Sequence, residues 1–235
     1  MKQNFSISAV IPMYNEESYV TDVVYKLKNV LESLTDDFEI IAVDDSSTDN
    51  TLNLLQSLSL SEKCIKIVRN PQNLGLGGTL RAGFNRATKD LIFYTDADLP
   101  CDLSNLETAL AVGKENNADI VAAYRSNRMV EGLKRFIYSR AYNLIIRLLF
   151  GVKVKDINFS FKLFKTDKLK KLDLFSQGSF IDSEIIIQAK RSGYKIVQIP
   201  LKYLLRERGV SKLDNFSNIK TIICEIFSFI KKNRL

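Results

Sequence analysis

Two carboxylates that lie two residues apart, Asp96 and Asp98, are the strongest chemical signal in this sequence. They follow a run of strand-forming apolar residues at 91–95, and Pro100 comes soon after them. In a parallel α/β sheet, ligands bind just beyond the carboxyl ends of the strands. Paired carboxylates there offer the hard oxygen ligands that Mg²⁺ or Mn²⁺ prefers, and such an ion usually holds the phosphates of a nucleotide. The alternative is an ordinary Asp-rich turn.

Two more predicted strands also end in polar clusters, which are Tyr14-Asn15-Glu16 and Asp44-Asp45. Because the ends of parallel strands meet at one edge of a sheet, these groups and the paired carboxylates could line one crevice. Pro12 and Tyr14 would then flank a nucleobase, and a carboxylate after the second strand would accept hydrogen bonds from the base or the ribose. The alternative is that Tyr14 and Glu16 only help to start the helix that follows.

The elements that must position these residues alternate between strand and helix. Strands are predicted over 6–11 (stopped by Pro12), 39–43, 65–68, 91–95 and 119–123. Helices are predicted over 20–34, from an N-cap among the serines and threonine of 46–48 to residue 60, over 79–87 and over 103–115. This alternation predicts an α/β fold with a Rossmann-like, mostly parallel sheet flanked by helices.

Beyond residue 124 the pattern loosens. Arg125 begins a polar loop, an apolar helix interrupted by Arg140 and Arg147 is predicted over 136–150, and a strand over 156–164. A helix over 183–191, with Asp182 near its cap, leads to a strand over 195–199. The chain ends in a predicted amphipathic helix within 214–235, whose apolar stripe consists of Phe216, Ile219, Ile222, Ile223, Ile226, Phe227 and Ile230.

Composition narrows the class of protein. The 46% hydrophobic and 26% charged residues are typical of a globular chain. Three widely spaced cysteines and the absence of histidine argue against zinc sites and histidine-based catalysis and favour a reducing compartment. The N-terminus predicts no signal peptide, and no apolar stretch reaches the roughly 18–20 residues that a spanning helix needs.

The net charge of +7 is unevenly distributed. Residues 1–124 carry 10 Lys and Arg against 18 Asp and Glu, a net charge of −8, whereas residues 125–235 carry 24 against 9, a net charge of +15. An acidic half suits the binding of cations, and a basic half suits phosphates or an anionic surface. Lysines that merely keep the protein soluble would produce the same excess.

A glycine-rich stretch precedes the predicted helix at 79–87. Gly75, Gly77 and Gly78 lack the G-x-G-x-x-G spacing and do not follow the first strand, which argues against a dinucleotide-dependent dehydrogenase. With Arg81 just inside the helix, the stretch is interpreted either as a cover for one side of a nucleotide or as a turn that needs glycine.

Several of these segments, taken in order, resemble the motifs of family 2 glycosyltransferases of the GT-A fold. They are residues 10–17, 43–51, 73–77 and 96–98. Two later segments are similar to motifs of the polyprenyl-phosphate glycosyltransferases, among them the dolichol-phosphate mannosyltransferases and dolichyl-phosphate glucosyltransferases. Residues 156–164 resemble their D-x-x-x-G-F-K-L-F segment, and residues 206–212 resemble their R-x-x-G-x-S-K segment. The similarity extends from about residue 7 to 213.

The resemblance implies a role for each matching residue. Asp96 and Asp98 would bind Mg²⁺ or Mn²⁺. The residues that would bind the nucleotide sugar are Pro12, Tyr14, Glu16, Asp44, Asp45, Arg81, Asp96 and Ala97. The residues that would act in catalysis are Asp98, Arg125, Asp182, Arg206 and Lys212; of these, Arg125, Arg206 and Lys212 would contact phosphates of the donor or the acceptor. Asp182 or Glu184 could act near the acceptor, although helix capping explains Asp182 equally well.

This chain departs from the family pattern at two positions. Pro100 stands where many relatives carry Gln, a residue that can supply a third metal ligand. Ser160 replaces the usual glycine of the G-F-K segment. These departures leave the third ligand and the backbone geometry at Ser160 open.

The resemblance implies one GT-A domain over 1–213, with a nucleotide-sugar half (1–124) and an acceptor half (125–213). We predict metal-dependent, inverting transfer of one sugar, mannose or glucose, from GDP-mannose or UDP-glucose to a polyprenyl phosphate (dolichyl or undecaprenyl). A lipid phosphate is already ionised near neutral pH, so it needs positioning rather than a base. One alternative is a family 2 enzyme with a non-lipid glycan acceptor, which would need Asp182 or Glu184 as a base. Another is a non-catalytic sugar-nucleotide-binding module.

The predicted partners follow from the acceptor. A polyprenyl tail stays in the bilayer, so we expect the protein at the cytoplasmic face of a membrane, with a membrane protein as a further partner. The C-terminal stripe, followed by Lys231, Lys232 and Arg234, could lie in the membrane interface or pack on the core. Nucleic acid is not expected, because the acidic half would repel its backbone.

Overall fold

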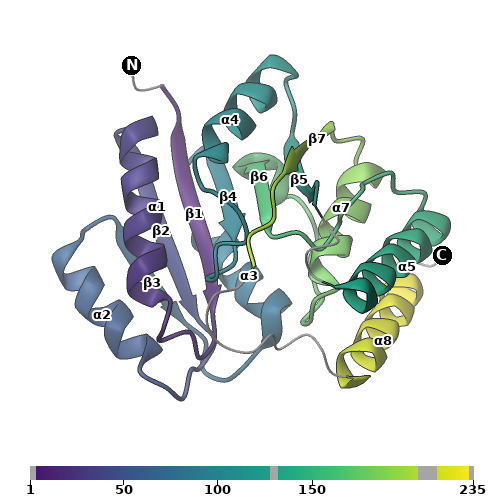
Figure 1. Cartoon of the computed structure of the whole chain (residues 1–235), viewed down its shortest axis with the longest axis horizontal. Helices are drawn as coiled ribbons and strands as arrows, with labels where there is room; N and C mark the ends of the chain where they lie inside the picture. The colour runs from purple at the N-terminus through teal and green to yellow at the C-terminus, as the bar shows by residue number, and fades with distance from the viewer. Residues whose placement is uncertain (1–3, 128–131, 206–215, 233–235) are drawn as a thin grey trace.

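The computed structural model describes residues 4–127, 132–205 and 216–232, and in this part of the chain seven strands form one sheet in the order β3-β2-β1-β4-β6-β5-β7 (Figure 1). The strands are β1 (Ser6–Met13), β2 (Asp37–Asp44), β3 (Ile65–Arg69), β4 (Leu91–Thr95), β5 (Ile120–Arg125), β6 (Phe161–Lys165) and β7 (Ile196–Leu201). β6 runs antiparallel to β4 and β5, and the other pairs are parallel. The predicted mostly parallel α/β sheet is therefore confirmed.

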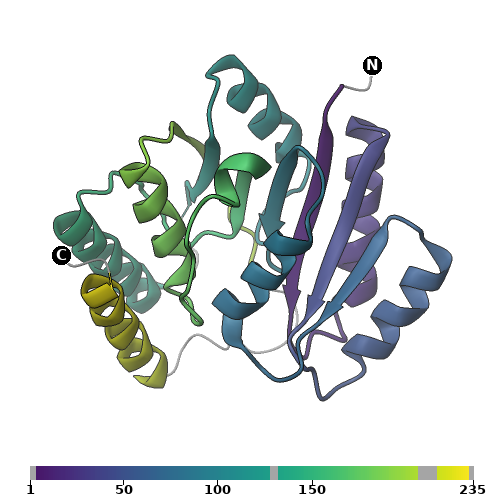
Figure 2. The ribbon, with the colours of Figure 1, turned by 180° about the vertical axis from the view of Figure 1, so that it is seen from behind.

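Helices cover both faces of the sheet. They are α1 (Val20–Leu34), α2 (Thr51–Ser61), α3 (Gly75–Arg86), α4 (Asn105–Glu115), α5 (Leu133–Phe150), the short α6 (Thr166–Leu169), α7 (Ile181–Arg191) and α8 (Phe216–Lys232). Because side chains alternate along a strand, Ile11 of β1 faces α1, α2 and α4, whereas its neighbour Val10 faces α3. Residues of α7, α8 and α5 join the core on the α3 side. The helices α5 and α8 lie next to each other in both views (Figures 1 and 2).

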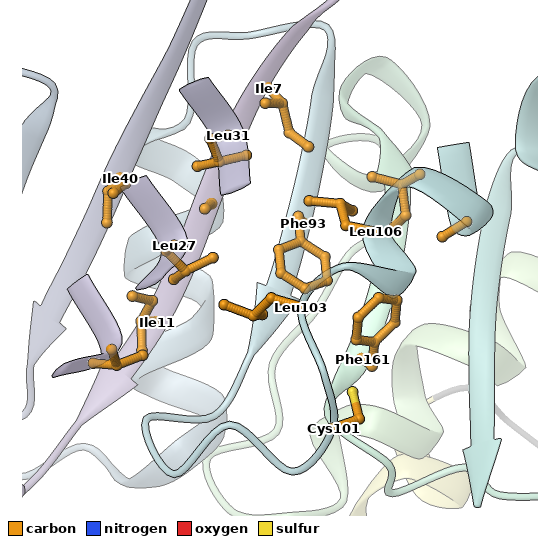
Figure 3. Packing of buried hydrophobic residues seen from close by; sticks show 14 of the residues in the cluster. Ile7, Ile11, Leu27, Leu31, Ile40, Phe93, Cys101, Leu103, Leu106 and Phe161 are labelled. Atoms are coloured by element: carbon orange, nitrogen blue, oxygen red, sulfur yellow. The ribbon is translucent and has the colours of Figure 1, made fainter. Parts of the chain in front are cut away.

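The larger core lies between one face of the sheet and the helices α1, α2 and α4 (Figure 3). Phe93 of β4 packs edge-on against Phe161 of β6, with ring centroids 4.8 Å apart. Leu31 of α1 and Leu106 of α4 are fully buried in the same cluster. Each such side chain contributes about 1.5–3 kcal/mol by leaving water. These contacts hold β4, the strand that leads to the paired carboxylates, in place.

The sequence predicted that Pro12 would end the first strand, but Pro12 lies inside β1, which continues to Met13. The carbonyl of Met13 accepts a hydrogen bond from the Asp45 N–H at 2.8 Å, so Met13 faces β2. The backbone polar groups of Pro12 are then directed toward the β4 side. The pairing of β4 with β1 ends at Val10 and Tyr94, before Pro12 is reached. The missing N–H of proline therefore costs no ladder hydrogen bond.

The helix predicted over 79–87 begins earlier, at Gly75, because a distant carboxylate caps it. Asp45, at the end of β2, accepts hydrogen bonds from the N–H groups of Leu74 (2.8 Å) and Gly75 (3.0 Å). The glycines form the first turn of α3. A side chain on Gly77 would lie 2.2 Å from the carbonyl oxygen of Ser176, so only glycine allows the two backbones to approach.

Two more predictions about element ends are wrong. The strand predicted over 156–164 begins only at Phe161, because the preceding residues turn to place Asp156 beside β5. The serines and threonine of 46–48 do not cap α2: its N-cap is Asn50, without a side-chain cap. The Oγ of Ser47 instead accepts a hydrogen bond from the Asn15 N–H at 3.0 Å. In both cases a long-range contact outweighs the local preference.

Smaller differences concern where the elements begin. The helix predicted over 103–115 begins at Asn105, and the one predicted over 136–150 begins at Leu133. Arg125 is the last residue of β5 rather than the first of a loop. The sheet passes through β5 without interruption, so it joins the predicted nucleotide-sugar and acceptor halves, and their division at residue 124 stays a prediction.

One buried carboxylate predicts how stability depends on pH. Glu39 of β2 is 1% exposed. Burial alone would raise the pKa of Glu39, but hydrogen bonds from Lys66, Ser8 and Thr88 outweigh it and lower the pKa from 4.5 to about 2. Because this pKa is depressed, the ionised carboxylate stabilises the fold at pH values above the pKa of the unfolded state. This contribution to stability is lost as the pH falls through the pKa of the folded state.

We therefore expect wild type to lose stability between about pH 4.5 and 2 more steeply than Glu39→Gln. The difference should be at most about 3 kcal/mol, because Lys66 is one-third exposed and its attraction is screened. Urea unfolding at a series of pH values measures it. Glu115→Gln, at an exposed site on α4, serves as the control. Parallel curves for wild type and Glu39→Gln would contradict the assignment.

Candidate active site

The paired carboxylates lie at the carboxyl end of β4, where the chain turns. Leu99 adopts a positive φ of 47° and its N–H bonds to the Asp96 carbonyl at 3.2 Å. Ala97 is buried, whereas Asp96 and Asp98 on either side of it are only partly buried. The turn therefore directs two carboxylates away from the core at one edge of the sheet, as the sequence predicted.

The environment of Asp96 is electrostatically unusual. Its Oδ1 accepts a hydrogen bond from the Tyr94 hydroxyl at 3.1 Å, and the Ser160 hydroxyl also hydrogen bonds to this carboxylate. Burial, followed by the charges of Asp98 and Asp182, raises the pKa of Asp96 to about 7, although both hydroxyl groups oppose the rise. Negative charge is thus concentrated at a place where a cation would relieve it.

This donor set fits a divalent metal ion that is shared with a ligand. The part of the chain that the structure describes contains no cluster of three or more His, Cys, Asp or Glu side chains that could hold an ion alone. Mg²⁺ and Mn²⁺ are commonly bound by one or two carboxylates together with substrate phosphates. Asp96 and Asp98 would hold the ion, and a diphosphate and water would complete its coordination.

The loops after β1 and β2 bind each other next to this edge. The side-chain oxygen of Asn15, which has a positive φ of 52°, accepts a hydrogen bond from the Thr48 N–H at 2.8 Å. The Glu16 N–H donates to the Thr51 Oγ1 at 2.8 Å. These bonds fix the half-buried Tyr14 beside the end of β2. The predicted contacts of Pro12, Tyr14 and Glu16 with a nucleoside stay predictions.

The two aspartates after β2 have different surroundings. Asp44 is fully buried, and its Oδ1 accepts a hydrogen bond from the Ser47 N–H at 3.3 Å. Both oxygens of Asp45 bind the start of α3, and its Oδ1 also accepts from Asn70 at 2.7 Å. Asp45 therefore positions the glycine turn. A direct contact of either aspartate with a nucleoside stays a prediction.

Arg81 makes its hydrogen bond within the protein. It lies in the middle of α3, where its guanidinium donates to the Leu174 carbonyl at 3.3 Å. This contact joins α3 to the segment before α7. The structure therefore assigns Arg81 a packing role in this conformation, and its contact with a nucleotide stays a prediction.

Arg125 forms a buried, bidentate ion pair. Its Nε and an Nη donate to the two oxygens of Asp156 at 2.7 and 2.9 Å. The guanidinium also lies over the rings of Phe159 and Tyr203, at 5.7 and 5.6 Å from their centroids. Such a planar, oriented guanidinium is suited to anion recognition. Its contact with a phosphate stays a prediction.

The two carboxylates at the start of α7 are buried, and their predicted action near the acceptor stays a prediction. Asp182 is 2% exposed and accepts a hydrogen bond from Lys162 at 2.5 Å. It does not cap α7, whose N-cap is Phe180 without a side-chain bond. Glu184 is fully buried and accepts from the N–H groups of Phe175 and Ser176. Both carboxylates are held in internal contacts.

Arg206 and Lys212 lie outside the described residues. The described chain just before them reaches the site: the Leu204 N–H donates to the Pro100 carbonyl at 2.8 Å. Asn127 exchanges two hydrogen bonds with the backbone of Tyr203, at 2.7 and 3.1 Å. The segment that leads to the predicted R-x-x-G-x-S-K motif is thus attached beside the paired carboxylates.

Four residues that contact or position the predicted site residues were not assigned this role from the sequence. They are Tyr94, Asp156, Lys162 and, as a hydrogen-bond donor, Ser160. A signal was present, because a lysine in the apolar run 161–164 must find a partner if the run is buried. The partner itself could not be read from the sequence.

The mixed seven-stranded sheet flanked by helices, with paired carboxylates after β4, has the architecture of the GT-A class. Residues 8–173 match the family described as Glycosyl transferase family 2. The chain belongs to this family.

Three curated relatives are similar over most of this chain. Glycosyltransferase AglD of Haloferax volcanii is 30% identical over 217 residues, which are 88% of this chain and 34% of the relative. Dodecaprenyl-phosphate galacturonate synthase of Rhizobium johnstonii is 28% identical, over 89% of this chain and 62% of the relative. Polyprenol monophosphomannose synthase of Mycolicibacterium smegmatis is 28% identical, over 96% and 87%. This chain thus spans less than two thirds of the first two.

A solved structure shares the fold. Glucosyl-3-phosphoglycerate synthase from Mycobacterium tuberculosis, in complex with Mn²⁺, uridine-diphosphate and phosphoglyceric acid, superposes with a TM-score of 0.70 at 20% identity. The match covers 96% of this chain and 78% of that one. It confirms the predicted GT-A fold.

Removing either carboxylate should weaken metal binding without unfolding the protein. We expect Asp96→Asn and Asp98→Asn each to reduce Mn²⁺ affinity by about tenfold or more, because each loses an anionic ligand. Titration followed by electron paramagnetic resonance measures free Mn²⁺, and thermal unfolding checks the fold. Glu107→Gln, at an exposed site on α4, is the control. Unchanged affinity in both Asn variants would refute the metal site.

Proposed function

We propose that the protein is a metal-dependent, inverting glycosyltransferase that moves one sugar from a nucleotide diphosphate sugar to a polyprenyl phosphate. The observation that carries the proposal is the placement of Asp96 and Asp98 at the edge of the sheet in a family 2 chain. Two relatives whose names specify a polyprenyl phosphate product match 89% and 96% of the chain. The proposed sugars are mannose and glucose, supplied as GDP-mannose or UDP-glucose.

The residues around the site support this chemistry. A bound metal would stabilise the charge that develops on the leaving diphosphate. The loops after β1 and β2 would hold the nucleoside, and the glycine turn of α3, fixed by Asp45, lies next to them. Arg125, Arg206 and Lys212 would hold the acceptor and donor phosphates in line for attack.

The state of Asp182 and Glu184 favours a phosphate acceptor. A hydroxyl acceptor would need a general base, whereas a phosphate oxygen is already ionised near neutral pH. Asp182 is in a buried ion pair, and Glu184 is bound to backbone N–H groups. A non-lipid acceptor is the second candidate, because the structural neighbour with a TM-score of 0.70 was solved with phosphoglyceric acid.

Transfer assays with labelled nucleotide sugars distinguish the two candidates. We expect Mn²⁺- or Mg²⁺-dependent transfer of sugar to a short polyprenyl phosphate and none to phosphoglyceric acid or to the dephosphorylated polyprenol. Chelation should abolish the reaction. Transfer to phosphoglyceric acid alone would establish the second candidate, and transfer in excess chelator would refute metal dependence.

A polyprenyl phosphate acceptor implies contact with a membrane, and α5 and α8 offer a surface for it. None of the helices in the described ranges is long and apolar enough to cross a bilayer. Their exposed large apolar side chains are Ile137, Tyr138, Leu144, Ile145, Leu148 and Leu149 on α5, and Ile223 and Phe227 on α8. Arg140 and Arg147 on α5 and Lys231 on α8 are also exposed. An apolar face with basic residues suits the interface of an anionic bilayer.

The apolar stripe of α8 divides between core and surface. Ile226 is 8% exposed and packs in the core, whereas Ile223 and Phe227 are 48% and 67% exposed. The most deeply buried residue of the described part of α8 is Phe229, which the predicted stripe did not include. The packing interpretation is therefore confirmed for Ile226, and a membrane contact of Ile223 and Phe227 stays a proposal. The side chains of Phe216 and Ile219 lie outside the described set.

Point variants test the membrane surface better than truncation, because α8 contributes Phe229 to the core. We expect Leu148→Glu combined with Phe227→Glu to reduce sedimentation with anionic vesicles about tenfold, since both side chains are exposed and apolar. Leu60→Glu, at a 90% exposed position on α2, should leave binding unchanged. Equal binding by the double variant would exclude this surface as the membrane contact.

A further inference from the structure

We propose that Lys162 is a positioning residue for the metal-binding carboxylate Asp96, acting through the hydroxyl groups of Tyr94 and Ser160. The inference deepens the proposed function, because it concerns the same metal site. It rests on hydrogen bonds, burial and strand register around the end of β4.

The first connection runs through Tyr94. Lys162 of β6 is directly opposite Tyr94 of β4 in the antiparallel pair. Its Nζ lies 5.6 Å from the centroid of the tyrosine ring, and both side chains are completely buried. The tyrosine hydroxyl donates to Asp96 Oδ1 at 3.1 Å. The lysine and the strand pairing therefore fix the direction of this hydrogen bond.

The second connection runs through the turn before β6. Lys162 Nζ donates to the Phe159 carbonyl at 2.8 Å. The next residue, Ser160, is 3% exposed, and its hydroxyl hydrogen bonds to Asp96. One buried ammonium group thus holds both segments that supply a hydroxyl donor to the same carboxylate. Hydrogen bonds of this kind set the orientation of a metal ligand before the metal arrives.

The charges are consistent with this role. Asp182 accepts a hydrogen bond from Lys162 at 2.5 Å, so these two buried charges balance each other. Asp96 and Asp98 remain as a pair of negative charges, which matches a divalent cation. Without the lysine, the buried Asp182 carboxylate would lose its counter-ion.

Mn²⁺ binding to the purified full chain tests the inference directly. Titrations are followed by electron paramagnetic resonance, with Mn²⁺ alone and with UDP or GDP present, and without sugar donor or acceptor. We expect Tyr94→Phe to raise the dissociation constant about tenfold, in the range typical of groups that orient a metal ligand. Ser160→Gly, which restores the residue of the motif that this segment resembles, should raise it severalfold.

The matched control is Tyr142→Phe. Tyr142 is a partly buried tyrosine whose hydroxyl bonds to Ser183 at 2.6 Å, so its loss removes a tyrosine hydrogen bond that does not involve Asp96. Its Mn²⁺ dissociation constant should stay within about twofold of wild type. Lys162→Met combined with Asp182→Leu removes the ion pair without leaving an unpaired buried charge. It should weaken Mn²⁺ binding about tenfold, as Tyr94→Phe does.

The outcomes separate this inference from the function on which it rests. Dissociation constants of Tyr94→Phe and Ser160→Gly within twofold of wild type would overturn the positioning role while leaving the metal site intact. Wild type that binds Mn²⁺ no better than Asp98→Asn would overturn the metal site and the inference together. Thermal unfolding of each variant shows whether a loss of binding reflects the fold. Absence of sugar transfer would leave the Mn²⁺ result unaffected.

Discussion

The antiparallel pairing of β6 with β4 is the constraint on which most of the site depends. It places a strand from late in the chain beside the strand that ends in the paired carboxylates. Lys162 comes to lie opposite Tyr94, and Ser160 comes within hydrogen-bond reach of Asp96. The same strand pairs with β5, which ends at Arg125. A shift of one residue in this register would turn Lys162 to the other face of the sheet.

The buried polar groups around β6 have a common physical reason. An ammonium or carboxylate group that leaves water must find an opposite charge or several hydrogen bonds. Lys162 with Asp182 and Arg125 with Asp156 satisfy this requirement on either side of the strand. These pairs add little net stability compared with apolar packing. We infer that their value lies in fixing direction at the site.

A second set of contacts connects α8 to the glycine turn. Glu225 of α8 accepts hydrogen bonds from the N–H groups of Gln177 and Gly178, at 3.0 and 2.6 Å. The Gln177 carbonyl accepts from the Gly77 N–H at 2.6 Å. Phe229 anchors α8 nearby, with its ring stacked on Phe175 at 5.8 Å between centroids. The proposed membrane surface and the proposed donor site are therefore parts of one packed structure.

The amino-acid sequence by itself determined the alternation of strands and helices, the position of the carboxylates after β4 and membership of a known family. These features depend on local periodicity and on short motifs, which are readable without coordinates. The apolar spacing of α1 and the strand that ends in Asp96 and Asp98 are examples. Element ends were less predictable wherever a distant group decided them, as Asp45 does for α3.

Only the tertiary structure decided which internal partners the charged residues have. Asp182 was interpreted either as a base or as a helix cap, and it is the partner of Lys162. Arg81 donates a hydrogen bond to the carbonyl of Leu174, a contact that the sequence did not reveal, and its predicted contact with a nucleotide stays a prediction. The reason is that a buried charge takes its role from the partner that folding brings within about 3 Å, and that partner is distant in sequence. Residue type and spacing specify which groups need a partner, and the packing of β6 and α7 specifies which partner each one receives.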